Sequence, residues 1–151
     1  MNQTMFTLVL FLHVLGASVW AGGHLVLSIT ILPRALRARD PAIITAFEDG
    51  FEKLGIPALL IQVVTGFLLA QRLLPNHAQW FSFDGPVATH IGIKFILLLL
   101  TIMLAVHARV RLIPKLDAHT LPALAAHIVA VTVLAVLFLL VGIGFRTGGI
   151  L

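Results

Sequence analysis

The sequence predicts an all-α integral membrane protein folded as a four-helix up-and-down bundle. Of the 151 residues, 60% are hydrophobic and only 11% are charged, whereas soluble domains carry roughly 25% charged residues. Four apolar segments, residues 4–32, 54–74, 87–110 and 122–145, are separated by short connections. Each is long enough to cross a hydrocarbon core of about 30 Å as a helix. Because no length remains for a second unit, we expect one domain over residues 1–151.

Prolines mark the expected ends of these spans. Pro33 ends the first span, Pro57 suits the first turn of the second, and Pro75 follows its last turn. Pro86 and Pro122 stand at the starts of the third and fourth spans. Proline is tolerated in a first helical turn and disrupts a helix interior, so these positions predict the span boundaries.

The first two connections have their own patterns. Asp40 followed by Pro41 resembles a helix N-cap with proline at the first helical position. The segment after it, AIITAFEDGFEKLG, fits either a short helix on the inner membrane surface or a solvated polar loop. The second connection holds Trp80, Phe81 and Phe83, which favours aromatic anchoring at the headgroup level.

Basic residues are distributed unevenly between the two sides. Two lie on the side of the chain termini, Arg72 and Arg146, and seven lie in the first and third connections: Arg34, Arg37, Arg39, Lys53, Arg109, Arg111 and Lys115. Lys and Arg accumulate in cytoplasmic loops, so this bias predicts both termini outside. The net charge of +4 is therefore a topology signal, and we expect the lipid bilayer, not nucleic acid, as the partner of this surface.

Histidines inside apolar helices are the main candidate site residues. His13 and His24 are eleven residues apart, which at about 100° per residue places both on one face of the first helix. Gly16 and Gly23 lie on or beside that face, where a second helix or a flat ligand can approach closely. A polar ring in hydrocarbon costs free energy unless it is paired. We therefore expect this face either to pack against another helix or to hold a ligand.

Folding the spans up and down sorts the polar groups into two sets. His24, His107 and His127 come from three helices at similar depth on the cytoplasmic side. Imidazoles that converge from separate helices form metal or haem sites in bundles, so we expect these three to bind a metal. His13 and Lys94 form an outer set, with His90 nearer the surface.

Composition narrows the chemistry of such a site. The chain has no cysteine, so thiolates are excluded as ligands, and Met103 is the one methionine away from the N-terminus, where Met1 and Met5 lie. No phosphate-binding loop or nucleophile–base motif occurs, which excludes nucleotide-binding and hydrolase functions. His119 lies in a connection and is expected to be solvated.

Several stretches resemble the copper-resistance protein D (CopD) family. These are LHVLGASVWAGGHLVL in the first span, TGFLLA in the second, IGIKFILLLLTIMLAVHARVRLIPKL in the third and VGIGF in the fourth. The pattern is similar, more distantly, to the HemJ-type protoporphyrinogen oxidases, whose first-helix histidine and third-helix lysine would correspond to His13 and Lys94. The first resemblance implies copper handling at the bacterial inner membrane, and the second implies b-type haem and redox chemistry.

Two functions follow as alternatives. In the first, His24, His107 and His127, with His13, bind copper that the protein accepts or passes across the membrane, with a periplasmic metal carrier as a possible partner. In the second, haem b is held by axial histidines from the first-helix face, with Lys94 or Arg146 pairing with its propionates and a redox partner exchanging electrons.

Overall fold

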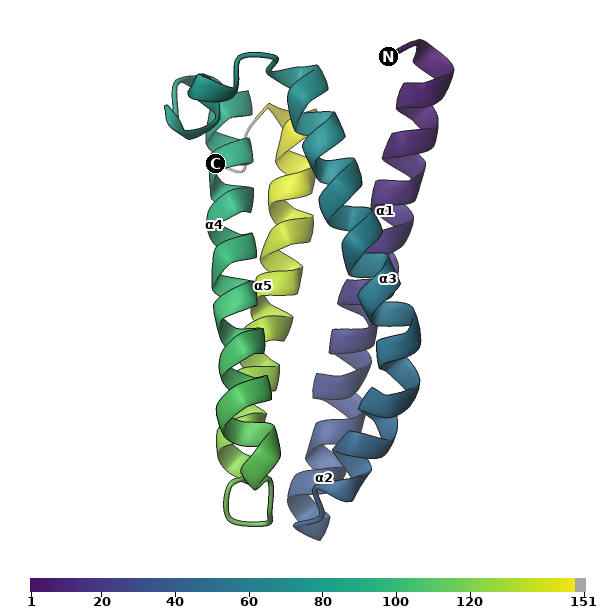
Figure 1. The fold of residues 1–151 in the computed structure, drawn as a ribbon, viewed down its shortest axis with the longest axis vertical. Coiled ribbons are helices and arrows are strands. Elements are labelled where there is room, and N and C mark those ends of the chain that lie inside the picture. The colour runs from purple at the N-terminus through teal and green to yellow at the C-terminus, as the bar shows by residue number, and fades with distance from the viewer. Residues whose placement is uncertain (149–151) are drawn as a thin grey trace.

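The computed structural model describes residues 1–148, which form a bundle of four long helical rods (Figure 1). Each rod is long and apolar enough to cross a membrane. The predicted fold class is therefore confirmed, and the chain is a multi-pass membrane protein. The long helices are α1 (Gln3–Val26), α3 (Ala42–Leu73), α4 (Gly85–His107) and α5 (Leu121–Thr147). The shorter elements are π-helical η1 (Leu27–Ile31), α2 (Leu32–Ala38), 3₁₀-helical η2 (His77–Phe81), π-helical η3 (Ala108–Leu112) and 3₁₀-helical η4 (Ile113–Lys115).

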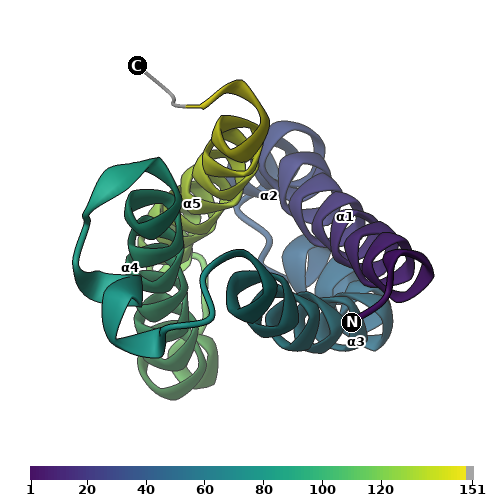
Figure 2. The ribbon, with the colours of Figure 1, turned by 90° about the horizontal axis from the view of Figure 1, so that it is seen from above.

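The helices are arranged in the spatial order α3, α1, α5, α4. α1 packs against both α3 and α5, and α5 packs against α4 (Figure 2). The start of α1 and the end of α5 lie towards one end of the bundle, which we call the terminal end (Figure 1). The opposite end, which we call the α2 end, holds α2 and the connection between α4 and α5 (Figure 1).

Pro33 lies inside the first rod and does not end it, contrary to the sequence-based prediction. The rod continues to Ala38, and Arg39 then terminates it in the left-handed conformation with φ of 53°. Immediately before the proline, the backbone N–H of Leu32 bonds to the carbonyl of Leu27, five residues back. This wider π turn makes room where the proline ring would otherwise meet the preceding turn.

The same π turn occurs after α4, directly before Pro114. The N–H of Ile113 bonds to the carbonyl of Ala108, again five residues back, directly before Pro114. Both π-helical segments lie near the α2 end of the bundle. The first rod and the rod that contains α4 therefore accommodate Pro33 and Pro114 in the same way. The π turn η3 begins directly after His107.

The segment between Ala42 and Lys53 is neither a surface helix nor a loop. It forms the first turns of α3, which continues through Pro57 to Leu73. The helix begins one residue later than predicted, with Pro41 as its N-cap, and the Asp40 carboxylate accepts a hydrogen bond of 2.9 Å from the N–H of Ala42. Burial of apolar side chains from these turns explains why the segment joins the bundle.

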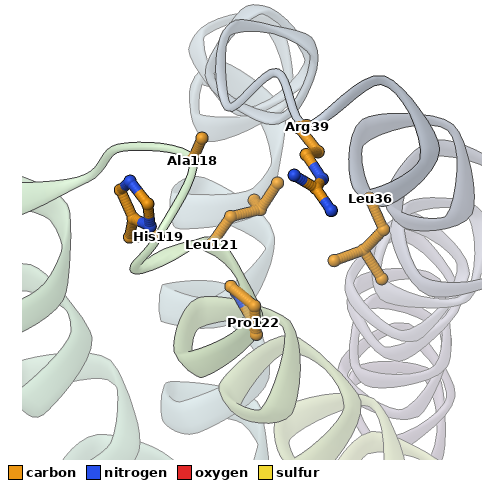
Figure 3. A pocket seen from close by; sticks show the side chains of 6 residues that line it. All are labelled: Leu36, Arg39, Ala118, His119, Leu121 and Pro122. Carbon is orange, nitrogen blue, oxygen red and sulfur yellow. The ribbon is translucent and has the colours of Figure 1, made fainter.

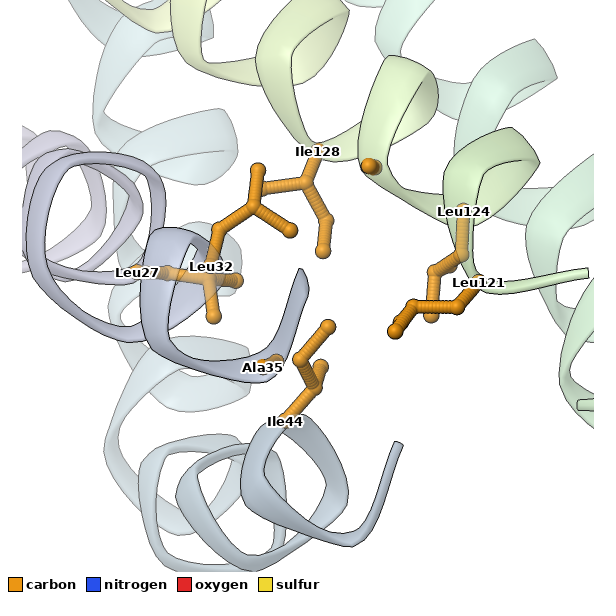
Figure 4. Packing of buried hydrophobic residues seen from close by; sticks show 8 residues of the cluster. Leu27, Leu32, Ala35, Ile44, Leu121, Leu124 and Ile128 are labelled. Carbon is orange, nitrogen blue, oxygen red and sulfur yellow. The ribbon is translucent and has the colours of Figure 1, made fainter. Parts of the chain in front are cut away.

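A cluster of buried aliphatic residues holds the α2 end together. It joins the first rod to α3 and to the first turns of α5 (Figure 4). Ala108 and Leu112 of η3 pack against it from the side of α4. The cluster therefore fixes the adjacent turns of α4 and α5, which carry His107 and His127. Its buried members are Leu27, Leu32, Ala35, Ile44, Leu121, Leu124, Ala125 and Ile128.

Aromatic side chains connect α3 to α4 at the terminal end. Trp80 of η2 is buried, donates a hydrogen bond of 2.8 Å to the carbonyl of Leu74, and stacks on Phe95 with ring centroids 5.5 Å apart. Phe67 of α3 contacts both rings. The expectation that Trp80 anchors at the headgroups is therefore wrong, because packing between the two helices buries its ring, whereas Phe81 stays exposed.

Candidate metal site

Two histidines from different helices meet near the α2 end. His107 is the last residue of α4, and His127 lies in the second turn of α5. Nδ1 of His107 is 2.8 Å from Nε2 of His127. The two rings are nearly parallel, with an interplanar angle of 16° and centroids 4.8 Å apart. The pair therefore joins α4 to α5 through their imidazoles.

A backbone carbonyl determines which ring nitrogens of this pair carry a hydrogen. Nδ1 of His127 lies 3.1 Å from the carbonyl oxygen of Ala123, which can only accept, so this nitrogen carries the hydrogen. In a neutral imidazole the other nitrogen then holds a lone pair. Nε2 of His127 accordingly accepts from the Nδ1–H of His107. Metal-binding histidines are commonly oriented by such a bond from the second ring nitrogen to a carbonyl.

The pair lines an apolar groove between α4 and α5. The groove has a volume of about 690 Å³. Its lining residues are Leu100, Met103, Leu104, His107, His127, Ala130, Val133 and Leu134. The sequence alone gives Met103 no predicted role. Met103 and His107 are four residues apart, and this spacing predicts that both side chains lie on one face of α4.

His24 does not join this pair. Its Nδ1–H donates a hydrogen bond of 2.9 Å to the carbonyl of Trp20, and its ring packs against Trp20 and, edge to face, against Phe51 of α3. Within residues 1–148, no group of three or more His, Asp or Glu side chains is placed to hold one metal ion. The predicted convergence of three imidazoles is therefore wrong: two meet, and Phe51 occupies the space beside the third.

His13 connects α1 to α3. Its Nδ1 lies 2.9 Å from the hydroxyl oxygen of Thr65, and that hydroxyl donates its own hydrogen to the carbonyl of Ile61 at 2.5 Å. The Thr65 oxygen therefore accepts from the Nδ1–H of His13, which leaves the lone pair on Nε2. The ring also approaches Gly66, where an added Cβ would lie 3.2 Å from the imidazole Cε1.

The glycine face of α1 is filled by α3. An added Cβ at Gly16 would lie 2.9 Å from the backbone oxygen of Ala58, and one at Gly23 would overlap the ring of Phe51. Of the two occupants that the sequence allows for this face, a helix or a flat ligand, the structure contains the helix. No space for a macrocycle is left along these glycines.

Lys94 and His90, the other two residues of the outer set, lie between α4 and α5. The ammonium of Lys94 stands over the Phe145 ring, 5.4 Å from its centroid, and makes no ion pair with any residue between 1 and 148. His90 is buried against the same ring, and its Nδ1–H donates to the carbonyl of Pro86. Its Nε2 is buried without a partner in this part of the chain. Arg146 is exposed in the last turn of α5.

His119 lies in the loop at the α2 end, as expected. It lines a shallow pocket of about 430 Å³ with Arg39 and four apolar residues (Figure 3). Asp117 shapes this loop by accepting hydrogen bonds from the N–H groups of Thr120 and His119. Hydrogen bonds from Thr120 and His119 hold the pKa of Asp117 below its usual value. This pocket has no lining residue in common with the groove of the histidine pair.

A comparison with protein families gives a match to copper resistance protein D over residues 45–145. The match covers more than half of the chain and includes nearly all of α3, α4 and α5. The chain belongs to the CopD family. This CopD protein is accordingly a membrane protein of copper resistance, and His107 and His127 lie within the matched residues, whereas His13 and His24 precede them. Searches of curated proteins and of solved structures gave no significant match.

Proposed function

We propose that this CopD protein binds copper through intramembrane histidines, with His107 and His127 as the ligand pair. The observation that carries the proposal is the contact of 2.8 Å between their ring nitrogens. Imidazole suits copper in both oxidation states. The protein acts as one unit of residues 1–151 in the bacterial inner membrane, where it accepts copper or passes it on.

The geometry of the pair fits a shared metal ion. A metal–nitrogen bond of about 2.0 Å separates two ligand nitrogens by about 2.8 to 4 Å, depending on the angle at the metal. The facing nitrogens of His107 and His127 therefore need little movement to admit one ion, once the hydrogen of His107 moves from Nδ1 to Nε2. Ala123 keeps the His127 ring oriented meanwhile, because its carbonyl holds the opposite nitrogen.

Haem b receives no support from the contacts that the sequence suggested for it. The glycine face of α1 packs against α3, and the Phe51 ring of α3 lies edge to face against His24. Lys94 pairs with an aromatic ring near the terminal end. We therefore propose copper and not haem as the bound species.

Copper content of single-site variants tests the proposal. The parent protein, purified in detergent and loaded with copper, should retain the metal after desalting, and His107→Ala and His127→Ala should each lose most of it. His77→Ala is the matched control, because His77 is an exposed residue at the terminal end. Circular dichroism checks that each variant stays helical.

Two results would contradict the copper assignment. The first is equal copper retention by the parent and both histidine variants, which would make the pair a packing contact. The second is a Soret band in the visible spectrum of the purified protein that disappears in a histidine variant, which would identify haem as the bound group.

A further inference from the structure

The groove that holds the histidine pair is also lined by a thioether, the side chain of Met103. Met103 lies one helical turn before His107 on α4, and both line the groove together with His127. Residues four apart on a helix are neighbours on its surface. The Met103 side chain is 59% exposed, so the surrounding helices do not enclose its thioether.

We infer that Met103 completes a site of two imidazoles and one thioether that is selective for Cu(I). This inference rests on the proposed copper site and names the oxidation state that it takes. A thioether is a soft ligand, which favours Cu(I) over Zn(II). The unbranched methionine side chain can adjust its three rotatable bonds to reach a metal held by the imidazoles.

The absence of charged side chains from the lining of the groove favours a monovalent ion over a divalent one. Its five other lining residues besides the three ligands are apolar, and no carboxylate lines it. Three neutral ligands leave the full charge of the metal in an apolar environment. The electrostatic cost of transferring an ion rises with the square of its charge, so a divalent ion costs about four times as much as a monovalent ion of the same size. The groove therefore disfavours Cu(II) and Zn(II).

The position of Met103 also distinguishes it from the other methionines. Met1 and Met5 are exposed in the first residues of the chain, and neither lines the groove. A methionine that only faced lipid could be replaced by leucine without consequence, because the two side chains have similar volume and polarity. A ligand cannot be replaced in this way, since leucine lacks a donor atom.

Competitive titration with Ag(I), a redox-inert monovalent soft ion, and with Cu(II) tests the inference. Met103→Leu should weaken Ag(I) binding by at least about tenfold, the equivalent of about 1.4 kcal/mol, and should leave Cu(II) affinity unchanged. Met103→Cys, which supplies a soft sulfur again, should restore Ag(I) binding. Met5→Leu is the control and should match the parent for both ions.

The outcomes separate the inference from the proposed function. If Met103→Leu binds Ag(I) as tightly as the parent while His107→Ala and His127→Ala do not, Met103 is no ligand and the copper site stands on the histidines alone. Equal loss of Ag(I) and Cu(II) in Met103→Leu would also overturn the inference, because it indicates altered packing. If the parent binds neither ion, the proposed function itself fails.

Discussion

His13 of α1 and Thr65 of α3 are joined by a hydrogen bond of 2.9 Å inside the bundle. Each partner is constrained from a second direction, because the Thr65 hydroxyl also donates to Ile61 and the His13 ring lies against Gly66. The bond therefore sets the spacing of α1 and α3 in the half of the bundle near the termini. It also accounts for a histidine in an apolar span without a bound ligand.

Replacing Thr65 by valine should destabilise the protein. Valine keeps the shape of threonine but removes the acceptor, so the N–H of His13 loses its partner in a membrane interior. The expected loss is about 1 kcal/mol, measured as a lower unfolding temperature in detergent. Thr65→Ser is the control, because it keeps the hydroxyl. If valine and serine variants unfold together with the parent, the bond contributes nothing to stability.

Gly22 and Gly23 are neighbours in α1 that should respond in opposite ways to alanine. An added Cβ at Gly23 overlaps the Phe51 ring, whereas one at Gly22 meets no atom within 4 Å. Gly23→Ala should therefore cost about 1–3 kcal/mol through overpacking. Gly22→Ala should be neutral or slightly stabilising, because alanine is the better helix former.

Thermal unfolding of the two glycine variants measures this difference. Both add the same methyl group to the same helix, so a shared change in membrane insertion or detergent binding cancels between them. The diagnostic quantity is the difference between their unfolding temperatures. Equal values would show that α3 does not pack on this face of α1, and the filled glycine face would lose its support.

The positions of the helices could be predicted from the sequence, because their signal is local. Apolar length identifies the four spans, and Asp40 marks the start of α3 before a proline. The meeting of His107 and His127 also follows from local information, since a short connection between antiparallel helices brings the end of one beside the start of the next. Their contact at 2.8 Å is the result.

What could not be predicted depends on packing between distant segments. Depth along α1 predicts that His24 joins the inner site, but its ring bonds to the Trp20 carbonyl and packs against Phe51 of α3 instead. Pro33 predicts a helix end, because the π turn that accommodates the proline has no sequence signature. The spacing of Met103 from His107 places both on one face of α4, but the groove that they line forms only when α4 packs against α5.

The orientation of the bundle in the membrane follows from its basic residues. Basic residues lie together at the α2 end of the bundle. They include Arg34 and Arg37 of α2 and Arg109 and Arg111 of η3. The Arg109 guanidinium lies 3.3 Å from the Glu52 carboxylate, and both are exposed. Such a surface pair contributes little to stability. The remaining charge is positive, and positive loops stay on the cytoplasmic side.

Both chain termini should therefore face the outside of the cell. Alkaline phosphatase, which is active only outside the cytoplasm, should be active when fused after Thr147 and inactive when fused in the loop that contains His119. A fluorescent reporter that folds only in the cytoplasm should give the reverse pattern and serves as the control. Activity of the phosphatase in the His119 loop, with none after Thr147, would reverse the orientation. The histidine pair and its groove would then lie near the outer surface, where the protein would take copper from the opposite compartment.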